Sequence, residues 1–89
     1  MARYSVEFTA RAHRQFAKLE RATQIRLAPA IDALADDPRP PGCVKLAGAD
    51  DLYRIRVGVY RIVYAIEDDR LVVLFVKVGH RRDAYRENA

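Results

Sequence analysis

The pattern of apolar and polar residues predicts strands at the start and in the second half of the chain. Residues 3–8 alternate, with Tyr4, Val6 and Phe8 on one side, which is the period of a half-buried strand. From residue 44 onward, β-branched and aromatic residues recur between turn signals. The expected strands there are Val44–Leu46, Leu52–Val57, Tyr60–Ile66 and Leu71–Val78. Gly58 and the acidic pair Asp68-Asp69 would form the turns that join the last three strands.

The segment between these strands has helical spacing. Thr9 is the predicted N-cap of a helix over Ala10–Glu20, and Thr23 is the predicted N-cap of a second helix. The apolar positions of the two helices are Ala12, Phe16 and Leu19, and then Leu27, Ala28, Ile31, Leu34 and Ala35. Pro29 lies inside the second helix, where we expect it to kink the helix or shift its start. The proline-rich segment 36–42 should be an extended loop.

The element order predicts the fold class. A strand, an antiparallel helix hairpin and then a meander of three or four antiparallel strands make an α+β fold, with the helix pair covering one face of the sheet. The 89 residues form a single domain, 1–89, without repeats or linkers.

Composition narrows the possible functions. The chain has sixteen lysine and arginine residues, most of them arginine, and twelve acidic residues, which gives a net charge of +4. Because the planar guanidinium grips phosphate through two hydrogen bonds, this bias favours a polyanionic partner. No apolar run approaches the ~20 residues of a membrane span and no signal-peptide pattern opens the chain, so we expect no membrane partner and a cytoplasmic location. The single Cys43 can build neither a disulfide nor a thiolate zinc site alone.

Register counting places three arginines together. Side chains alternate along a strand, so Arg54 and Arg56 share one face. If Gly58-Val59 is a two-residue turn, Arg56 lies opposite Arg61. Like charges directly opposite each other destabilise a sheet, and a bound anion would relieve the repulsion. Alternatively, the arginines line a solvated face that Asp50 or Asp51 neutralises.

A second basic group follows the last strand, in the run from Lys77 to Arg86. We expect the end of that strand to emerge beside the hairpin of the arginines. His80 is the one side chain in this run whose ordinary titration range includes neutral pH. Tyr85 offers a ring for base stacking and a hydroxyl for a phosphate or ribose. Alternatively, His80 is a surface residue and Tyr85 fixes the tail to the domain.

These residues resemble a known family. The run from Leu52 to Tyr64 (LYRIRVGVYRIVY) and the run from Gly79 to Tyr85 (GHRRDAY) are similar to the RelE branch of the RelE/ParE toxin superfamily. Asp36 to Pro38 and the later Lys45 to Gly48 fit the same pattern, so the resemblance covers almost the whole chain. It implies a RelE-like, microbial-ribonuclease type of fold and a ribosome-dependent endoribonuclease. It also implies three partners: the 70S ribosome, mRNA and a cognate antitoxin.

The resemblance also implies site residues. Arg54 and Arg56 fall where RelE toxins often carry catalytic lysines. Arg61 falls on the hairpin arginine, Arg81 on the arginine after the last strand, and Tyr85 on the C-terminal tyrosine. Two positions depart from the family: arginine at 54 and 56 is a poor general base, and Ala47 replaces a basic residue of some members.

Metal-free RNA cleavage requires the ribose 2′-hydroxyl to attack the adjacent phosphorus. We expect Arg56, Arg61 and Arg81 to stabilise the phosphorane, and Arg54 to grip a flanking phosphate. His80 is a hypothetical acid or base. The residues expected to bind RNA are Lys45, Arg54, Arg82 and Arg86. No acidic pair or histidine cluster resembles a metal site, so neither a metal nor a small-molecule cofactor is expected.

Two other functions remain open at this stage. A ParE-like inhibitor of DNA gyrase would share the fold without needing the basic site. A non-catalytic module that binds RNA or a protein partner would use the same surface charge without chemistry.

Overall fold

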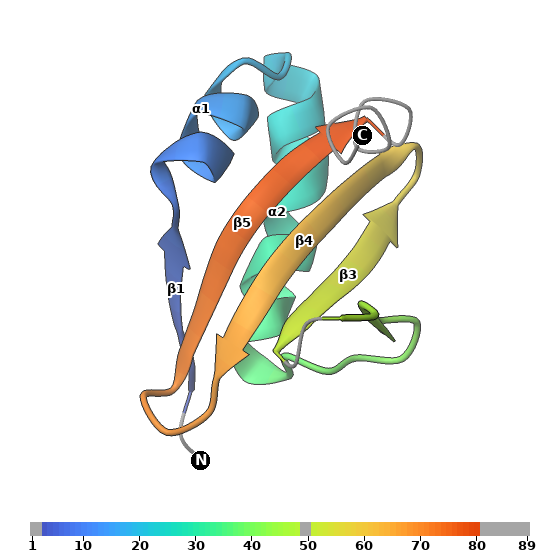
Figure 1. The fold of residues 1–89 in the computed structure, drawn as a ribbon. Coiled ribbons are helices and arrows are strands. Elements are labelled where there is room, and N and C mark those ends of the chain that lie inside the picture. Colours follow the sequence, from blue (N-terminus) through green and yellow to red (C-terminus); the bar gives the residue numbers. More distant parts are fainter. Residues whose placement is uncertain (1–2, 49–50, 81–89) are drawn as a thin grey trace.

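The computed structural model describes residues 3–48 and 51–80, which form two helices and five strands (Figure 1). In chain order the elements are β1 (Ser5–Phe8), α1 (Ala10–Ala17), α2 (Arg21–Asp36), β2 (Val44–Lys45), β3 (Leu52–Val57), β4 (Tyr60–Glu67) and β5 (Val72–His80). The last three strands match their predicted ranges to within two residues at either end.

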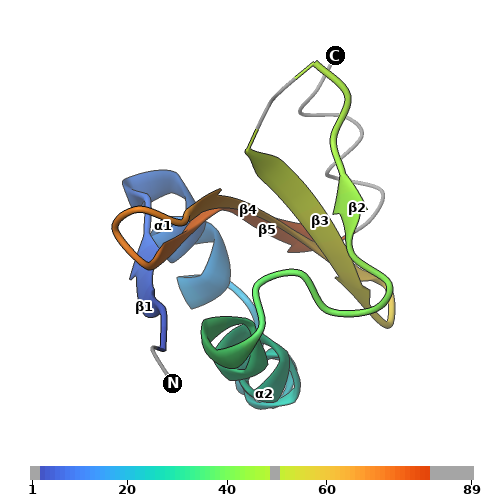
Figure 2. The same ribbon diagram turned by 90° about the horizontal axis from the view of Figure 1, so that it is seen from below.

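The strands form one sheet in the order β1-β5-β4-β3-β2. β2 to β5 are a meander of antiparallel neighbours, whereas β1 pairs with β5 in parallel. A parallel partner needs a long crossover, and the segment that leaves β1 begins with the helix pair. Figure 2 shows α2 on one side of the sheet and α1 beside the sheet edge at β1 and β5. The predicted α+β fold is confirmed.

The core lies between the helices and one sheet face, which we call the helix face. Leu27 and Leu34 of α2 pack with Ile62, Tyr64 and Phe75 of the sheet, and all five are almost completely buried. The buried Tyr64 hydroxyl donates a hydrogen bond of 2.8 Å to the Pro38 carbonyl. This bond satisfies a polar group that would otherwise be costly to bury. Burial also raises the pKa of Tyr64.

The helix ends differ in part from the prediction. Thr9 is the N-cap of α1, since its hydroxyl accepts a bond of 3.1 Å from the Ala12 amide, but α1 ends at Ala17 rather than at Glu20. The prediction that Thr23 caps α2 is wrong: α2 already begins at Arg21. Of the two effects predicted for Pro29, a shift of the helix start is wrong for the same reason, and a kink stays a prediction. Proline removes the N–H that would bond the carbonyl of Ile25, and this turn is exposed, so water can replace the bond.

The β3–β4 hairpin has the predicted register. Val57 pairs with Tyr60, and Arg56 pairs with Arg61. Gly58 adopts a φ of +61°, which favours glycine at the first position of a two-residue turn.

A β-bulge interrupts β5. Val63 pairs with Lys77 and Tyr64 with Phe75, so Val76 is an extra residue without a partner in β4. The start of α1 supports this bulge, because the Thr9 hydroxyl donates to the Val76 carbonyl at 3.4 Å. Gln15 accepts a bond of 2.8 Å from the Val78 amide. Helix α1 thus replaces β1 as the partner of β5 beyond the end of β1.

Candidate functional site

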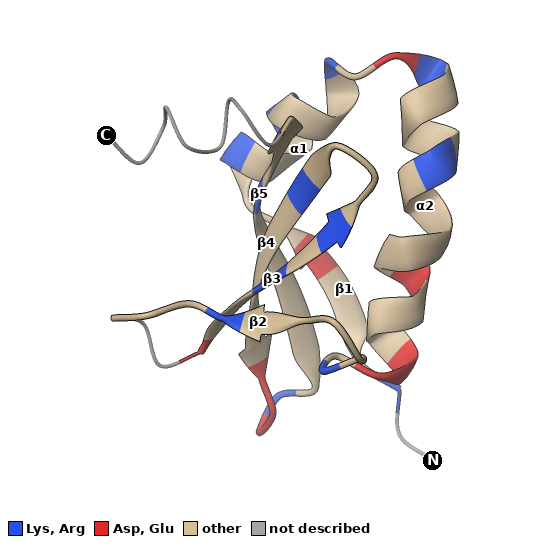
Figure 3. Cartoon of the chain, turned by 90° about the vertical axis from the view of Figure 1, so that its right-hand side faces the viewer, with Lys and Arg blue, Asp and Glu red and all other residues tan. Residues whose placement is uncertain are grey.

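The three predicted arginines lie on the sheet face away from the helices, which we call the open face. Arg56 is directly opposite Arg61, and Arg54 is opposite Val63. Since residues that pair directly point to the same side, all three share the open face. Figure 3 shows basic segments of β3, β4 and β5 near the β3–β4 hairpin. The predicted grouping of these arginines is confirmed.

A pocket of about 200 Å³ opens on this face. Half of its lining residues are cationic and half are aliphatic: Arg11, Arg54, Arg61 and Lys77, and then Leu46, Leu52, Val63 and Val76. The cations come from four different elements: α1, β3, β4 and β5. A pocket that combines several cations with an apolar wall suits a phosphate that carries a nucleoside.

Two cations of the pocket are almost completely buried. Arg61 is 9% exposed and Lys77 is 7% exposed. Lys77 pairs with Val63, two residues from Arg61 on the same face, so the two cations are diagonal neighbours across β4 and β5. Placing two like charges side by side in a poorly hydrated site is unfavourable for the fold. Such an arrangement favours a bound anion, because weak solvation strengthens the attraction between opposite charges.

Arg56 differs from its neighbours. It is exposed and does not line the pocket, although it lies beside Arg61 in the register. The geometry therefore places Arg54 and Arg61 at the centre of the site and Arg56 at its margin.

His80 lies near the hairpin, as predicted for the end of β5, but on the opposite side of the sheet from the arginines. It pairs with Tyr60, which shares the helix face with Ile62. The His80 and Tyr60 rings meet edge to face, with centroids 5.8 Å apart. The structure therefore does not bring His80 into the pocket.

The remaining predicted residues fall into two groups. Lys45 is exposed and pairs with Tyr53, so it does not share the face of Arg54. The others lie outside the described residues: Arg81, Arg82, Tyr85 and Arg86. Sequence reasoning missed Arg11 and Lys77 as pocket residues. Arg11 left no signal in the sequence, because a helix residue reaches the pocket only through the packing of α1 beside β5.

Most acidic segments of the chain lie toward the other end of the molecule, near the β4–β5 turn (Figure 3). Ion pairs there join Arg3 to Asp32, Arg39 to Asp68 and Arg70 to Glu67. Asp51, one of the two residues that could neutralise the arginine face, is exposed beside the start of β3, and Asp50 lies outside the described residues. The charge separation leaves the pocket end of the described chain strongly basic.

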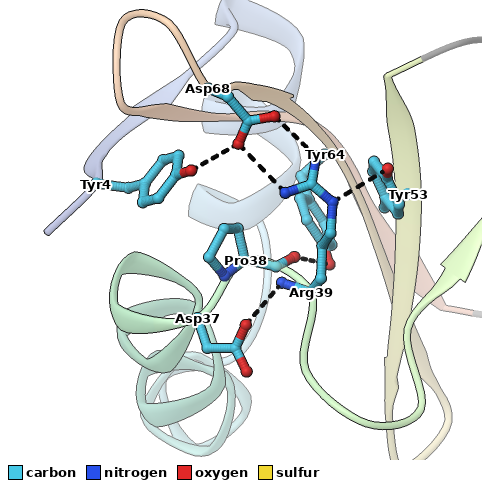
Figure 4. A network of polar contacts seen from close by, with 7 residues as sticks. All are labelled: Tyr4, Asp37, Pro38, Arg39, Tyr53, Tyr64 and Asp68. Atoms are coloured by element: carbon cyan, nitrogen blue, oxygen red, sulfur yellow. Dashed lines mark hydrogen bonds and ion pairs between the residues drawn. The ribbon is translucent and has the colours of Figure 1, made fainter. Parts of the chain in front are cut away.

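A network of polar side chains connects several segments at the acidic end of the molecule (Figure 4). Asp68 accepts hydrogen bonds from the Tyr4 hydroxyl at 2.6 Å and from the Arg39 guanidinium at 2.9 and 3.2 Å. Arg39 also donates to the Tyr53 hydroxyl at 3.3 Å. The bonds from Arg39 and then from Tyr4 lower the pKa of Asp68 to about 2. The network ties the start of β1, the loop after α2 and the β4–β5 turn to β3.

Residues 3–48 and 51–80 contain neither a candidate metal centre nor a candidate membrane-spanning helix. No cluster of three or more His, Cys, Asp and Glu side chains that could hold a metal ion occurs among them. Within the same residues, no helix has the length and apolarity needed to cross a membrane.

The sequence and the fold match one class of proteins. The family model described as "ParE toxin of type II toxin-antitoxin system, parDE" matches residues 6–85. The chain therefore belongs to the RelE/ParE family of type II toxin–antitoxin toxins, and the resemblance to its RelE branch is confirmed.

Relatives of known sequence support this assignment. The chain is 36% identical over 89 residues to toxin RelG of Mycobacterium tuberculosis, covering 93% of this chain and 97% of the relative. It is 31% identical over 80 residues to the mRNA interferase toxin RelE of Escherichia coli K12, covering 88% and 83%. Among solved structures, the toxin in the intact E. coli RelBE toxin–antitoxin complex superposes with a TM-score of 0.78 at 30% identity, covering 86% of this chain and 95% of that chain.

Proposed function

We propose that this toxin is a ribosome-dependent endoribonuclease that cuts mRNA without a metal ion and so inhibits translation. The observation that carries the proposal is the pocket in which Arg54, Arg61 and Lys77 converge, two of them buried. A relative named mRNA interferase supports the same activity. A cation pocket of this kind fits the doubly charged phosphorane that forms when RNA is cleaved by its own 2′-hydroxyl.

The proposed reaction is an in-line attack. The 2′-oxygen bonds to the adjacent phosphorus, and the bond from phosphorus to the 5′-oxygen breaks, leaving a 2′,3′-cyclic phosphate and a 5′-hydroxyl. Arg61 and Arg54 hold the equatorial oxygens, and each such donor contributes about 2–4 kcal/mol to lowering the barrier. Arg56, at the margin, holds a flanking phosphate. The aliphatic wall of Leu46, Leu52 and Val63 packs against the nucleoside attached to that phosphate.

The proposed partners are the 70S ribosome with its mRNA and a cognate antitoxin, all in the cytoplasm. Solved relatives include toxin–antitoxin complexes, among them RelBE of E. coli and RelE–RelB of Pyrococcus horikoshii. A basic pocket next to a sheet favours an antitoxin segment with acidic side chains that neutralise the cations. The proposal includes four further residues that bind RNA or take part in its cleavage: Arg81, Arg82, Tyr85 and Arg86. Lys45 belongs to it as a peripheral contact.

The test is to incubate the purified toxin with ribosomes that carry mRNA and to map the new RNA ends. Cuts at a fixed position within the codon exposed in the decoding site would support the nuclease. Intact mRNA together with cleaved DNA trapped on gyrase would identify a ParE-like poison instead. Intact RNA and DNA would leave only a binding module.

A further inference from the structure

We propose that Lys77 donates the proton that the leaving 5′-oxygen needs when this toxin cuts mRNA. The proposal rests on the nuclease function above and names a catalytic residue for it. Lys77 lies deep in the pocket, 7% exposed, and lines it together with Arg54 and Arg61.

The bulge in β5 places Lys77 there. Val73 and Phe75 point to the helix face and belong to the core, so strict alternation would point residue 77 to the helix face as well. Because Val76 is an extra residue, alternation restarts, and Lys77 pairs with Val63 on the open face. β-Bulges often redirect a side chain toward a functional site. Here α1 maintains the bulge through Thr9 and Gln15.

The chemistry of the lining singles out the same residue. The described residues that line the pocket are arginines, aliphatic residues and Lys77. A guanidinium stays protonated in proteins and can stabilise charge, but it does not readily give up a proton. Lys77 carries an ammonium group that can both stabilise charge and transfer a proton. His80, which also could transfer one, lies on the other face of the sheet.

Each proton that moves in the cleavage step has a defined source and destination. The 2′-hydroxyl loses its proton to a hydroxide ion of the solvent, and the 2′-oxygen forms a bond to phosphorus. The electron pair of the breaking bond between phosphorus and the 5′-oxygen stays on that oxygen, which takes a proton from the Lys77 ammonium. The neutral amine then recovers a proton from water, which regenerates hydroxide.

The first experiment measures single-turnover cleavage of mRNA on saturating ribosomes. Lys77→Met removes the ammonium, and Lys77→Arg keeps the charge but cannot supply the proton readily. We expect both variants to be slowed about 100-fold or more, the usual effect of general acid–base catalysis. The exposed Lys18→Met serves as the matched control and should cleave like wild type. Thermal unfolding reports whether each variant is folded, and if Lys77→Met does not fold, Lys77→Arg decides.

The second experiment replaces the 5′-bridging oxygen at the cut by sulfur. A thiolate leaves without a proton, so the Lys77→Arg variant should cut the sulfur substrate nearly as fast as wild type does. Two results would overturn the role of Lys77 while leaving the nuclease function intact. Lys77→Arg could be slowed equally on the oxygen and sulfur substrates, or it could cut the oxygen substrate as fast as wild type. If wild-type toxin cuts neither substrate on ribosomes, the nuclease function itself fails, and the role of Lys77 falls with it.

Discussion

One extra residue in β5 decides which side of the sheet Lys77 faces and which side His80 faces. Val76 occupies the bulge, so side chains beyond it are reversed relative to Val73 and Phe75. Lys77 consequently enters the basic pocket, whereas His80 packs against Tyr60 on the helix face. A slip of one residue exchanges the faces of all side chains that follow.

The first prediction concerns His80. His80→Gln should cleave mRNA on ribosomes with the pH profile of wild type between pH 5 and 8, because its ring is separated from the pocket by the sheet. The measurement is the single-turnover rate constant across that range. An inflection that is present in wild type and absent from His80→Gln would show that the imidazole takes part in the reaction.

At the scale of elements, the contact between α1 and the bulge of β5 connects the fold to the site. The side chain of Gln15 accepts the Val78 amide proton two residues after the bulge, where β1 no longer provides a partner. This contact keeps the backbone on either side of Lys77 in place. A helix on the opposite side of β5 from β4 thus determines where a pocket residue lies.

The second prediction follows from that contact. Gln15→Ala should lower the free energy of unfolding by about 1–3 kcal/mol, because the Val78 amide loses its acceptor in a partly buried position. Cleavage should slow as well, since Lys77 is held less firmly. Urea unfolding and the ribosome assay measure the two effects, with the exposed His13→Ala on the same helix as control. If Gln15→Ala matches His13→Ala in both, α1 does not maintain the bulge.

The elements differ in how far the sequence predicts them. Gly58 between two alternating runs determined the β3–β4 hairpin, and with it the pairing of Arg56 and Arg61, because a two-residue turn permits one register. The bulge was not predictable, because Val76 is as apolar as its neighbours and the hydrogen bonds that maintain it come from α1. The start of α2 was missed because it lacks a side-chain cap. Without a capping signal, a sequence leaves a helix boundary open.

At the scale of the whole molecule, charge divides the described chain into a basic end and an acidic end. The basic segments of β3, β4 and β5 that line the pocket lie toward one end (Figure 3). The network around Asp68 lies at the other end (Figure 4). Asp68, Arg39 and Tyr4 are partly exposed at the surface, so salt should weaken the ion pair. Because Asp68 is paired with Arg39 at the acidic end, its carboxylate does not compete with a phosphate for the cations of the pocket.

The third prediction concerns pH and stability. The pKa of Asp68 is about 2 in the folded protein and lies near 4 in an unfolded chain. A carboxyl group with a lowered folded pKa stabilises the fold above its unfolded pKa, and this contribution is lost as pH falls toward 2. Asp68→Asn should therefore be less stable than wild type at pH 7 and less sensitive to pH between about 5 and 2. Urea unfolding at several pH values measures this, with the neighbouring exposed Asp69→Asn as control. Equal pH slopes for wild type and Asp68→Asn would contradict the role of Asp68.

The central claim is that the pocket on the open face cuts mRNA on the ribosome. The most direct test is the single-turnover rate constant of cleavage on purified ribosomes, with identification of the new RNA ends, for wild type, Arg54→Gln, Arg61→Gln and the distant control Arg70→Gln. We predict a 2′,3′-cyclic phosphate and a 5′-hydroxyl for wild type, an unchanged rate for Arg70→Gln, and losses of about 100-fold or more for each folded pocket variant. Wild-type toxin that leaves mRNA intact, or folded pocket variants that cut as fast as wild type, would contradict the account.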